Sequence, residues 1–487
     1  MSSHVIRDEH LEPLLRTASW MPRDLRAAHR YEVADHAELG AGDLLLVVAA
    51  VGGPASGERM FVPVRGEPSG AVTEARGEGA HGLAAVRRVL TGARLRTTRG
   101  GYVDFRRAPS APAGQVRSLP FDQGWSSNSL SLVEVDGSPY IHKTYRRLTG
   151  AVHEPELLRL MSGTGHTPEW TGDYTYTDPV HGTRHPVGVL YRHVPGRGID
   201  APLRENLRSL WPRLTDGTAP EQLVRSHLLP LEAGLRTAGR FLRAFHRDLS
   251  ARLGAPATGY PVADALARSS ARLAELARAD APLPREARNA AFDALAAELS
   301  ALEIEFTDRT TTVGAGPCHG DLHLSHLLYS DAAVGAWRMS VIDLSTPALS
   351  PDDPGYAAQS PLQDLVAVQR ALEYFTADEA AFESARRLGI DSAETMNGSL
   401  DGAPGLPPAQ RAVLHSVFHT AGIWRERVLR LLLGPASGSP LRRLLYLRRL
   451  LHELGYNHDH ARPYHAAIDL RHALALASPA PTTYART

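Results

Sequence analysis

The apolar periodicity of this 487-residue chain changes near residue 200, and this change limits the class of fold that the chain can adopt. Before it, short apolar or alternating segments lie between glycine-rich turns, which is typical of strands. After it, apolar residues recur at helical spacing, and only one segment, 337–343, reads as a strand. Strands followed by helices, rather than strict alternation, predict an α+β fold. The predicted strands are 43–51, 59–64, 94–98, 129–135, 139–145 and 187–194, and the predicted helices are 155–161, 231–252, 262–278, 285–306, 361–375, 409–433 and 441–454.

The strand-rich part is interrupted by the sequence APSAPAG, which is typical of a linker. We therefore predict a β-rich N-terminal unit, a linker and a second small unit, followed by a long helical region. The last ten residues, SPAPTTYART, predict a disordered tail. The predicted boundaries are 1–107, 108–114, 115–195, 196–477 and 478–487.

Charge and composition exclude several classes of protein. The 53 basic residues are balanced by 53 acidic ones, whereas binding to nucleic acid or an anionic membrane needs a positive excess. The longest apolar run, 44–51, is much shorter than the roughly 20 residues of a membrane helix. The beginning MSSHVIRDEH has no apolar signal core. We expect a soluble, cytoplasmic monomer or dimer with no nucleic-acid or membrane partner.

Lys143 is the single lysine among the 53 basic residues. Arginine supplies the positive charge everywhere else, so the exception marks a site that a wide planar guanidinium does not fit. A compact ammonium differs most from guanidinium at tight phosphate sites. Lys143 is on the second strand of a predicted hairpin whose turn is Asp136-Gly137. The alternative is that chance left one lysine in an arginine-rich chain.

The densest chemical cluster is CHGDLHLSH at 318–326, followed by VID at 341–343. A kinase catalytic loop reads H-R-D-L-x-x-x-N and is followed by D-F-G at a strand end. On this pattern Asp321 occupies the catalytic-base position and Asp343 the metal-binding position.

The same pattern assigns a role to the single lysine. Lys143 would neutralise the α- and β-phosphates of ATP, paired with a glutamate of the next helix. Glu156 is the expected partner, with Glu154 as the second choice. The lysine strand, the glutamate helix, the catalytic aspartate and the metal aspartate occur in kinase order.

These residues resemble the aminoglycoside-phosphotransferase-like kinases, and within them the bacterial maltokinase and glucosamine kinase group. The likeness runs from about 115 to 475, and the strand-rich unit before it matches the cap subdomain of that group. The segments that carry it are 143–148, 156–158, 319–324, 341–343, 360–365, 450–456 and 461–463.

The resemblance implies a bilobal, protein-kinase-like fold with a β-rich cap over 1–107, an N-lobe over 115–195 and a mostly helical C-lobe over 196–477. It also implies transfer of the γ-phosphoryl group of ATP, with Mg²⁺ or Mn²⁺, to a hydroxyl of a small carbohydrate. Maltose, glucosamine and a related amino sugar or cyclitol all remain open as acceptors.

The sequence departs from the family pattern at two places. His326 stands where the family has Asn or Gln as second metal ligand, and imidazole suits transition metals better than magnesium. Leu344-Ser345 replaces an aromatic residue and a glutamate after Asp343. We expect His326 and Asp343 to hold the metal, and the metal preference stays open.

Further nucleotide contacts follow from order along the chain. The polar segment 123–129, with Ser127, is the candidate phosphate loop, and an ordinary surface turn is the alternative. The segment 191–194, with Arg192 and Val194, resembles the hinge that reads adenine through its backbone.

For the acceptor, sugars are bound by aromatic faces and by polar side chains that hold hydroxyls. Trp424, Arg425, Glu426 and His419 are the candidates beside Asp321, with a core role as the alternative for Trp424. We expect Asp364 to hold the catalytic loop by hydrogen bonds.

Two other functions remain open. His319, His323 and His326 at i, i+4 and i+7 would share one face of a helix and, with the nearby aspartates, hold a metal in a hydrolase. That alternative leaves Lys143 unexplained and puts Gly320 inside the helix. The second of these functions is that of a retired, that is catalytically inactive, kinase, which binds its ligands but transfers no phosphoryl group. His326 and Ser345 suggest it.

Overall fold

Strands dominate the first part of the chain and helices the second, and the division lies after Val194. In the computed structural model the two units, Met1–Val194 and Pro195–Thr487, each have their own sheets and their own core. This order of strands and helices confirms the predicted α+β class. Among the helices that the structure describes, none has the length and apolarity needed to cross a membrane. The structure describes residues 8–40, 42–66, 72–75, 79–122, 126–148, 152–215, 217, 219–256, 258–279, 284–307, 314–333, 336–353, 355–434 and 439–477.

The first sheet of unit 1 is a four-stranded antiparallel sheet in the order β1-β2-β3-β4. Two N-terminal helices pack on it, and their apolar side chains share a core with the inward-facing residues of the strands, among them Leu11, Leu15, Leu46 and Val48. The continuous apolar run predicted as a buried strand is β2. The elements are α1 (Asp8–Thr17), α2 (Arg23–Arg26), β1 (Arg30–Gly40), β2 (Asp43–Val51), β3 (Arg59–Gly66) and β4 (Val72–Glu74).

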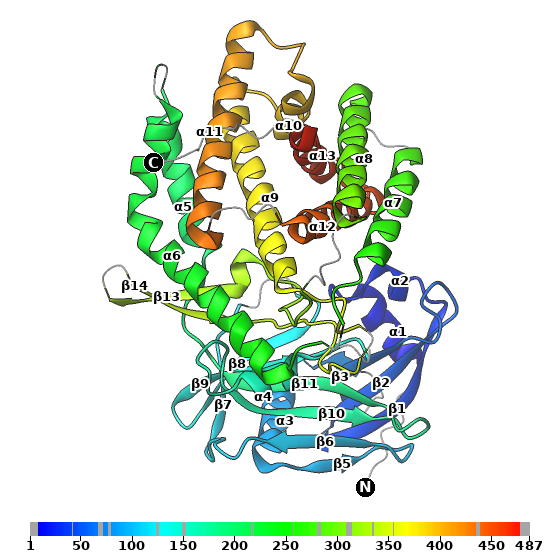
Figure 1. Ribbon diagram of the computed structural model, residues 1–487. Helices are drawn as coiled ribbons and strands as arrows, with labels where there is room; N and C mark the ends of the chain where they lie inside the picture. Colours follow the sequence, from blue (N-terminus) through cyan, green and yellow to red (C-terminus); the bar gives the residue numbers. More distant parts are fainter. Residues whose placement is uncertain are drawn as a thin grey trace. The chain divides into compact units, whose positions relative to one another are not determined.

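The second sheet of unit 1 has seven antiparallel strands in the order β5-β6-β10-β11-β9-β8-β7 (Figure 1). The predicted hairpin is β8-β9, and both turn residues, Asp136 and Gly137, have positive φ, as a tight hairpin turn requires. The elements are α3 (Ala80–Thr91), β5 (Arg94–Arg96), β6 (Tyr102–Arg107), β7 (Val116–Leu119), β8 (Ser129–Val135), β9 (Ser138–Thr144), α4 (Glu154–Met161), β10 (Trp170–Thr177) and β11 (Arg184–Arg192).

The Pro/Ala-rich stretch 108–114 does not separate two units, so the boundary predicted at 107 is wrong. Strand β6, which precedes the stretch, pairs with β10, and β7, which follows it, pairs with β8 of the same sheet. Ala108 and Ala111 are buried. The composition correctly indicated irregular backbone, but small alanine side chains also let such a segment pack against the sheet that it crosses.

Unit 2 is mostly helical and contains one small antiparallel sheet in the order β12-β13-β14. Helix α9 packs against both α11 and α12, and α6 packs against α11 (Figure 1). The elements are β12 (Arg197–Gly198), α5 (Asp200–Leu210), the 3-10 turn η1 (Trp211–Arg213), α6 (Pro220–Leu253), α7 (Val262–Arg278), α8 (Arg285–Thr307), the 3-10 turn η2 (Leu324–His326), β13 (Leu327–Ala333), β14 (Ala336–Val341), α9 (Pro361–Leu388), α10 (Ser392–Asp401), α11 (Pro408–Leu433), α12 (Pro440–Asp459) and α13 (Pro463–Ala477).

The predicted helices are present, and two of them are much longer than their apolar patterns indicated. Helix α6 begins at Pro220, whereas the prediction began at 231. Helix α9 continues to Leu388, whereas the prediction ended at 375. Its second half buries Thr376, Glu379 and Glu383, whose polar side chains hide the helical periodicity. The predicted disordered tail, 478–487, lies outside the described residues.

Candidate active site

The loop that carries Asp321 is held by a buried carboxylate at the start of α9. Asp364 accepts hydrogen bonds from the backbone N–H of His319 at 2.7 Å and of Gly320 at 3.1 Å. His246 of α6 lies 2.8 Å from the same carboxylate through Nε2. These contacts confirm the predicted role of Asp364 in holding the loop.

Gly320 is required by the shape of this loop. Its φ is +97°, a conformation that L side chains rarely adopt. A Cβ atom at this position would also lie 2.4 Å from the carbonyl oxygen of Ser345. The glycine therefore allows the loop that carries Asp321 to run close to the segment that follows Asp343.

The carboxylate of Asp321 lies beside two cationic or donor side chains of unit 2. Its Oδ1 atom is 3.1 Å from His323 Nε2 and 3.8 Å from Arg449 Nη1 of α12. The hydrogen bond from His323, with help from the Arg449 charge and against the effect of burial, lowers the pKa of Asp321 to about 2. Asp321 is therefore ionised at neutral pH and can accept a hydroxyl hydrogen.

The side chains of His326 and Asp343 are neighbours. His326 Nε2 lies 3.5 Å from Asp343 Oδ2, and His326 Nδ1 lies 3.0 Å from the carbonyl oxygen of Asp321. Because a carbonyl only accepts, Nδ1 carries the proton, which leaves the lone pair on Nε2, the atom beside the Asp343 carboxylate. Burial is the main cause that lowers the pKa of His326 to about 4, so its imidazole is neutral at pH 7.

Asp343 follows β14 with φ at +62°, in the left-handed region. Such a conformation is costly for a residue other than glycine and is common at functional sites. Among the described residues, no group of three or more His, Cys, Asp or Glu side chains is arranged to hold a metal. A site with two protein ligands still fits magnesium, which keeps several waters and uses one or two carboxylates together with substrate phosphates.

The helix predicted for the hydrolase alternative does not form within the described segment 314–333. Leu324–His326 makes a short 3-10 turn, and His323 precedes it with extended backbone. The positive φ of Gly320 interrupts any helix before that turn. His319, His323 and His326 therefore do not share a helical face, and that alternative loses its geometric basis.

Unit 1 contains the single lysine in a buried ion pair. Lys143 Nζ of β9 lies 2.7 Å from Glu154 Oε2, and the two side chains are 5% and 4% exposed. The Tyr145 hydroxyl donates to the same Glu154 oxygen at 2.7 Å. Glu154 is the first residue of α4 and was the second choice as partner.

Glu156, the expected partner of the lysine, is not in this pair. It binds Arg159 on its own helix and lies 3.5 Å from Arg106. Residues two apart on a helix do not share a face, so only one of the two glutamates of α4 can point at β9. The sequence pattern identified the helix that supplies the partner of Lys143 but selected the wrong glutamate on it.

The other nucleotide candidates lie in unit 1. Ser127 is exposed in a bend, while 123–125 of the candidate phosphate loop lie outside the described residues. The backbone N–H of Arg192 donates to the carbonyl oxygen of Glu169, so this group is already used. Val194 is the last residue of the unit and stays a candidate for backbone contact with adenine.

Trp424 is a core residue, so its prediction as a sugar platform is wrong. It is fully buried, donates through Nε1 to Asn206 Oδ1 at 2.9 Å and packs against Phe375. The bulk and apolar surface of an indole ring explain its place between α11 and its neighbours.

The two residues that follow on α11 and the histidine before them are nearer the surface. Arg425 forms an ion pair with Glu426 at 2.9 Å. His419 is exposed, and its ring stacks on His415. The contacts described for these three residues do not join them to Asp321.

Arg449 is the neighbour of Asp321 that the sequence pattern did not indicate. It donates to Glu453 Oε1 at 2.6 Å, one helical turn further along α12. The i,i+4 spacing of the two residues predicts their pairing, but not that a loop far earlier in the chain lies beside them.

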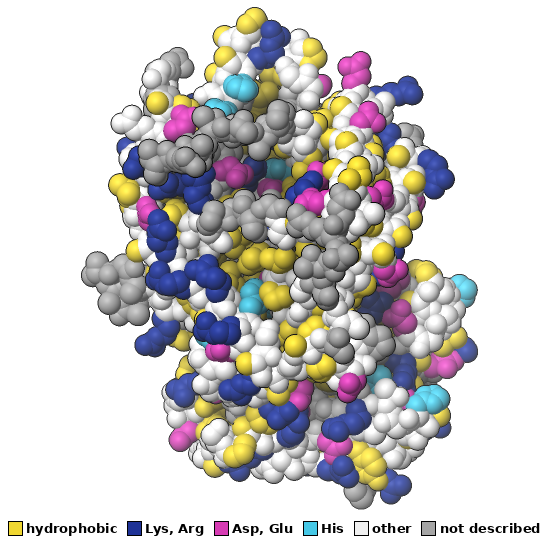
Figure 2. All heavy atoms as spheres, viewed as in Figure 1, with side chains coloured by type: hydrophobic (Ala, Val, Ile, Leu, Met, Phe, Trp, Pro, Cys, Tyr) yellow, Lys and Arg dark blue, Asp and Glu magenta, His cyan; other side chains and the backbone are white. Residues whose placement is uncertain are grey.

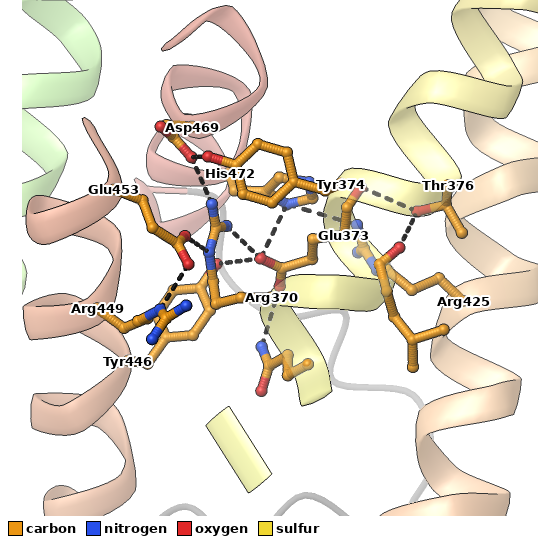
Figure 3. A network of polar contacts seen from close by, with 12 residues as sticks. Arg370, Glu373, Tyr374, Thr376, Arg425, Tyr446, Arg449, Glu453, Asp469 and His472 are labelled. Atoms are coloured by element: carbon orange, nitrogen blue, oxygen red, sulfur yellow. Dashed lines mark hydrogen bonds and ion pairs between the residues drawn. The ribbon is translucent and has the colours of Figure 1, made fainter. Parts of the chain in front are cut away.

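Glu453 connects Arg449 to a buried polar network (Figure 3). Arg370 of α9 is 1% exposed; it donates to Glu453 Oε2 at 2.8 Å and also pairs with Glu373 and Asp469. Three carboxylates around one guanidinium fix the relative positions of α9, α12 and α13. In Figure 2, acidic, basic and histidine side chains gather in a recess of the helical unit.

The fold can be compared with solved structures, although no family model and no curated protein matches this sequence. One crystal form of a glucosamine kinase gives a TM-score of 0.51 at 19% identity, covering 94% of this chain and 95% of that one. A second crystal form gives 0.53 at 18% identity, covering 96% and 99%. Identity at this level shows shared architecture only. The chain has the fold of the glucosamine kinase. This agrees with the fold that we expected from the resemblance to aminoglycoside-phosphotransferase-like kinases.

Proposed function

We propose that this protein is an ATP-dependent phosphotransferase whose acceptor is a hydroxyl of a small carbohydrate. The observation that carries the proposal is the arrangement around the catalytic loop. Asp321 presents an ionised carboxylate, and His326 Nε2 and Asp343 Oδ2 face each other at 3.5 Å. Kinases use this combination of an acceptor-orienting aspartate and an adjacent metal position.

Asp321 would orient the acceptor hydroxyl and take its proton. A carboxylate with so low a pKa is a weak base, so its main contribution is to position the hydroxyl oxygen for in-line attack. Arg449, close to the same carboxylate, would hold the acceptor or balance the charge of Asp321.

The residues present fit a metal–nucleotide complex. Magnesium-bound ATP would supply the phosphoryl group and the charge neutralisation that the transfer needs. In unit 1, Glu154 holds the Lys143 ammonium in one orientation, where it would bind the α- and β-phosphates. In unit 2, His326 and Asp343 would hold the metal, with Mn²⁺ as a substitute for Mg²⁺ because one ligand is imidazole.

The choice of acceptor class is supported by the names of similar solved structures rather than by the contacts of the site. Both solved structures described above carry the name glucosamine kinase. We therefore propose glucosamine or a related amino sugar first, with maltose and cyclitols as the other acceptors.

The test is ADP release from ATP with Mg²⁺ or Mn²⁺ against glucosamine, maltose, glucose, cyclitols and aminoglycosides. Acceptor-dependent ADP release that is lost in Asp321→Asn would support the proposal. If the folded protein binds ATP but releases no ADP with any acceptor, the result would favour the hypothesis of a catalytically inactive kinase.

A further inference from the structure

A cavity of about 260 Å³ lies inside unit 2, among helices α9, α10, α11 and α13. It is lined by apolar atoms and by an unusual set of nitrogen donors. The lining residues that matter are Thr376, Phe418, Gly422, Arg425, Arg471 and His472. None of them belongs to the group around Asp321, His326 and Asp343.

Arg471 is a cation for which the described part of the chain provides no carboxylate partner. Its guanidinium lies over the Phe418 ring at 4.4 Å, and it donates to the carbonyl oxygen of Ser399 at 3.1 Å. Burial, and then the neighbouring Arg425, lower the pKa of Arg471 to about 10, which leaves it charged at pH 7. A buried cation without a carboxylate partner is costly unless something supplies the opposite charge.

His472 adds an unused donor to the same cavity wall. The residue is 5% exposed, and its Nε2 atom has no hydrogen-bond partner among the described residues. Its Nδ1 atom lies 3.4 Å from Arg425 Nη1, which only donates, so Nδ1 accepts and Nε2 carries the proton (Figure 3). A buried N–H needs an acceptor, which a water molecule or a ligand supplies.

The carboxylates that the structure describes near the cavity bind residues other than Arg471. Glu373 Oε2 is 3.8 Å from His472 Nδ1, but this carboxylate already binds Arg370 and Tyr446. Glu426, the partner of Arg425, has a side chain that is 60% exposed to solvent.

We propose that this cavity binds the anionic group, a phosphate or a carboxylate, of a small molecule. Arg425 and Arg471 would hold the oxygens in the way guanidinium groups hold phosphate and carboxylate, and His472 Nε2 would donate a further bond. The volume is slightly below the usual range of ligand pockets, so the cavity suits inorganic phosphate or a short phosphate ester rather than a nucleotide.

The experiment is calorimetric titration of the full chain with inorganic phosphate and, separately, with acetate, in the absence of ATP. We expect saturable binding of one of them with a Kd of about 1 mM or tighter. Arg471→Gln should weaken it by about tenfold or more, since it removes a charge-assisted bond. Exposed Arg268 of α7 offers a matched control, and Arg268→Gln should bind like the unmodified protein.

A second variant keeps the test decisive if Arg471→Gln does not fold. A Cβ atom at Gly422 would meet no atom within 4 Å, so Gly422→Leu can fill the cavity without a clash at that atom. This variant should also lose anion binding. Unchanged binding in the variants, or no saturable binding of either anion, would overturn the proposal. Because no nucleotide or turnover is involved, this result is separate from the outcome of the kinase assay.

Discussion

Lys143 Nζ lies 2.7 Å from Glu154 Oε2 in the interior of unit 1, and the Tyr145 hydroxyl donates to the same oxygen. The carboxylate thus has two donors on one oxygen, which fixes the ammonium before any ligand arrives. Two neighbouring glutamates on α4 with different partners make this relationship testable.

Glu154→Gln should lower kcat/KM for ATP by about tenfold to a hundredfold, because the lysine loses the charge that orients it. Glu156→Gln is the matched control on the same helix. Its carboxylate pairs with arginines near the surface, so we expect less than about a twofold change. Equal losses in the two variants would contradict the assignment of Glu154.

Lys143→Arg should lose activity to a similar degree although the positive charge is kept. The side chain of Lys143 is 5% exposed, and a planar guanidinium does not fit the space of a compact ammonium. Steady-state kinetics with ATP as the varied substrate measures the effect. Full activity in this variant would mean that the single lysine of the chain is an accident of composition.

The sequence predicted the change from strands to helices near residue 200 because strand and helix periodicities differ, and it singled out the loop 318–326 because the spacing of its histidines and Asp321 is distinctive. It could not choose between Glu154 and Glu156, since that choice depends on where α4 begins. The prediction for Trp424 was wrong because the sequence of a helix does not show whether its tryptophan packs in a core or binds a sugar. Arg449 was missed because only the tertiary fold brings α12 beside the loop that carries Asp321.

Asp321→Asn should lower kcat by about 10²–10⁴ while the affinity for ATP changes little. The amide keeps the shape of the side chain but removes the carboxylate charge that orients the acceptor hydroxyl and takes its proton. Single-turnover kinetics and nucleotide titration separate the two quantities. Retained turnover would end the assignment of Asp321 as the catalytic residue.

The metal preference should follow from the imidazole at position 326. We expect half-maximal activity at an about tenfold lower concentration of Mn²⁺ than of Mg²⁺, because nitrogen ligands favour transition metals. His326→Asn replaces the nitrogen ligand by an amide oxygen and should reduce this difference. A metal preference that is the same in the variant would show that His326 does not touch the metal.

Two buried histidines of unit 1 should make the protein less stable in mild acid. His142 and His81 are 2% and 4% exposed, and burial lowers their pKa values to about 4 and about 3. The unfolded chain takes up these protons below pH 6.5, whereas the folded chain does not. The free energy of unfolding therefore falls as pH falls from 6.5 toward 4, by about 1.4 kcal/mol per pH unit for each histidine.

Urea unfolding at pH 7, 6 and 5 measures this slope. His142 Nε2 contacts the Tyr174 hydroxyl at 3.1 Å, and a glutamine can keep a hydrogen bond there without titrating. His142→Gln should reduce the slope of the free energy of unfolding against pH by the contribution of one histidine. Exposed His419 provides the control, since His419→Gln should leave the slope unchanged. If both variants keep the slope of the unmodified protein, His142 is not a source of the acid sensitivity.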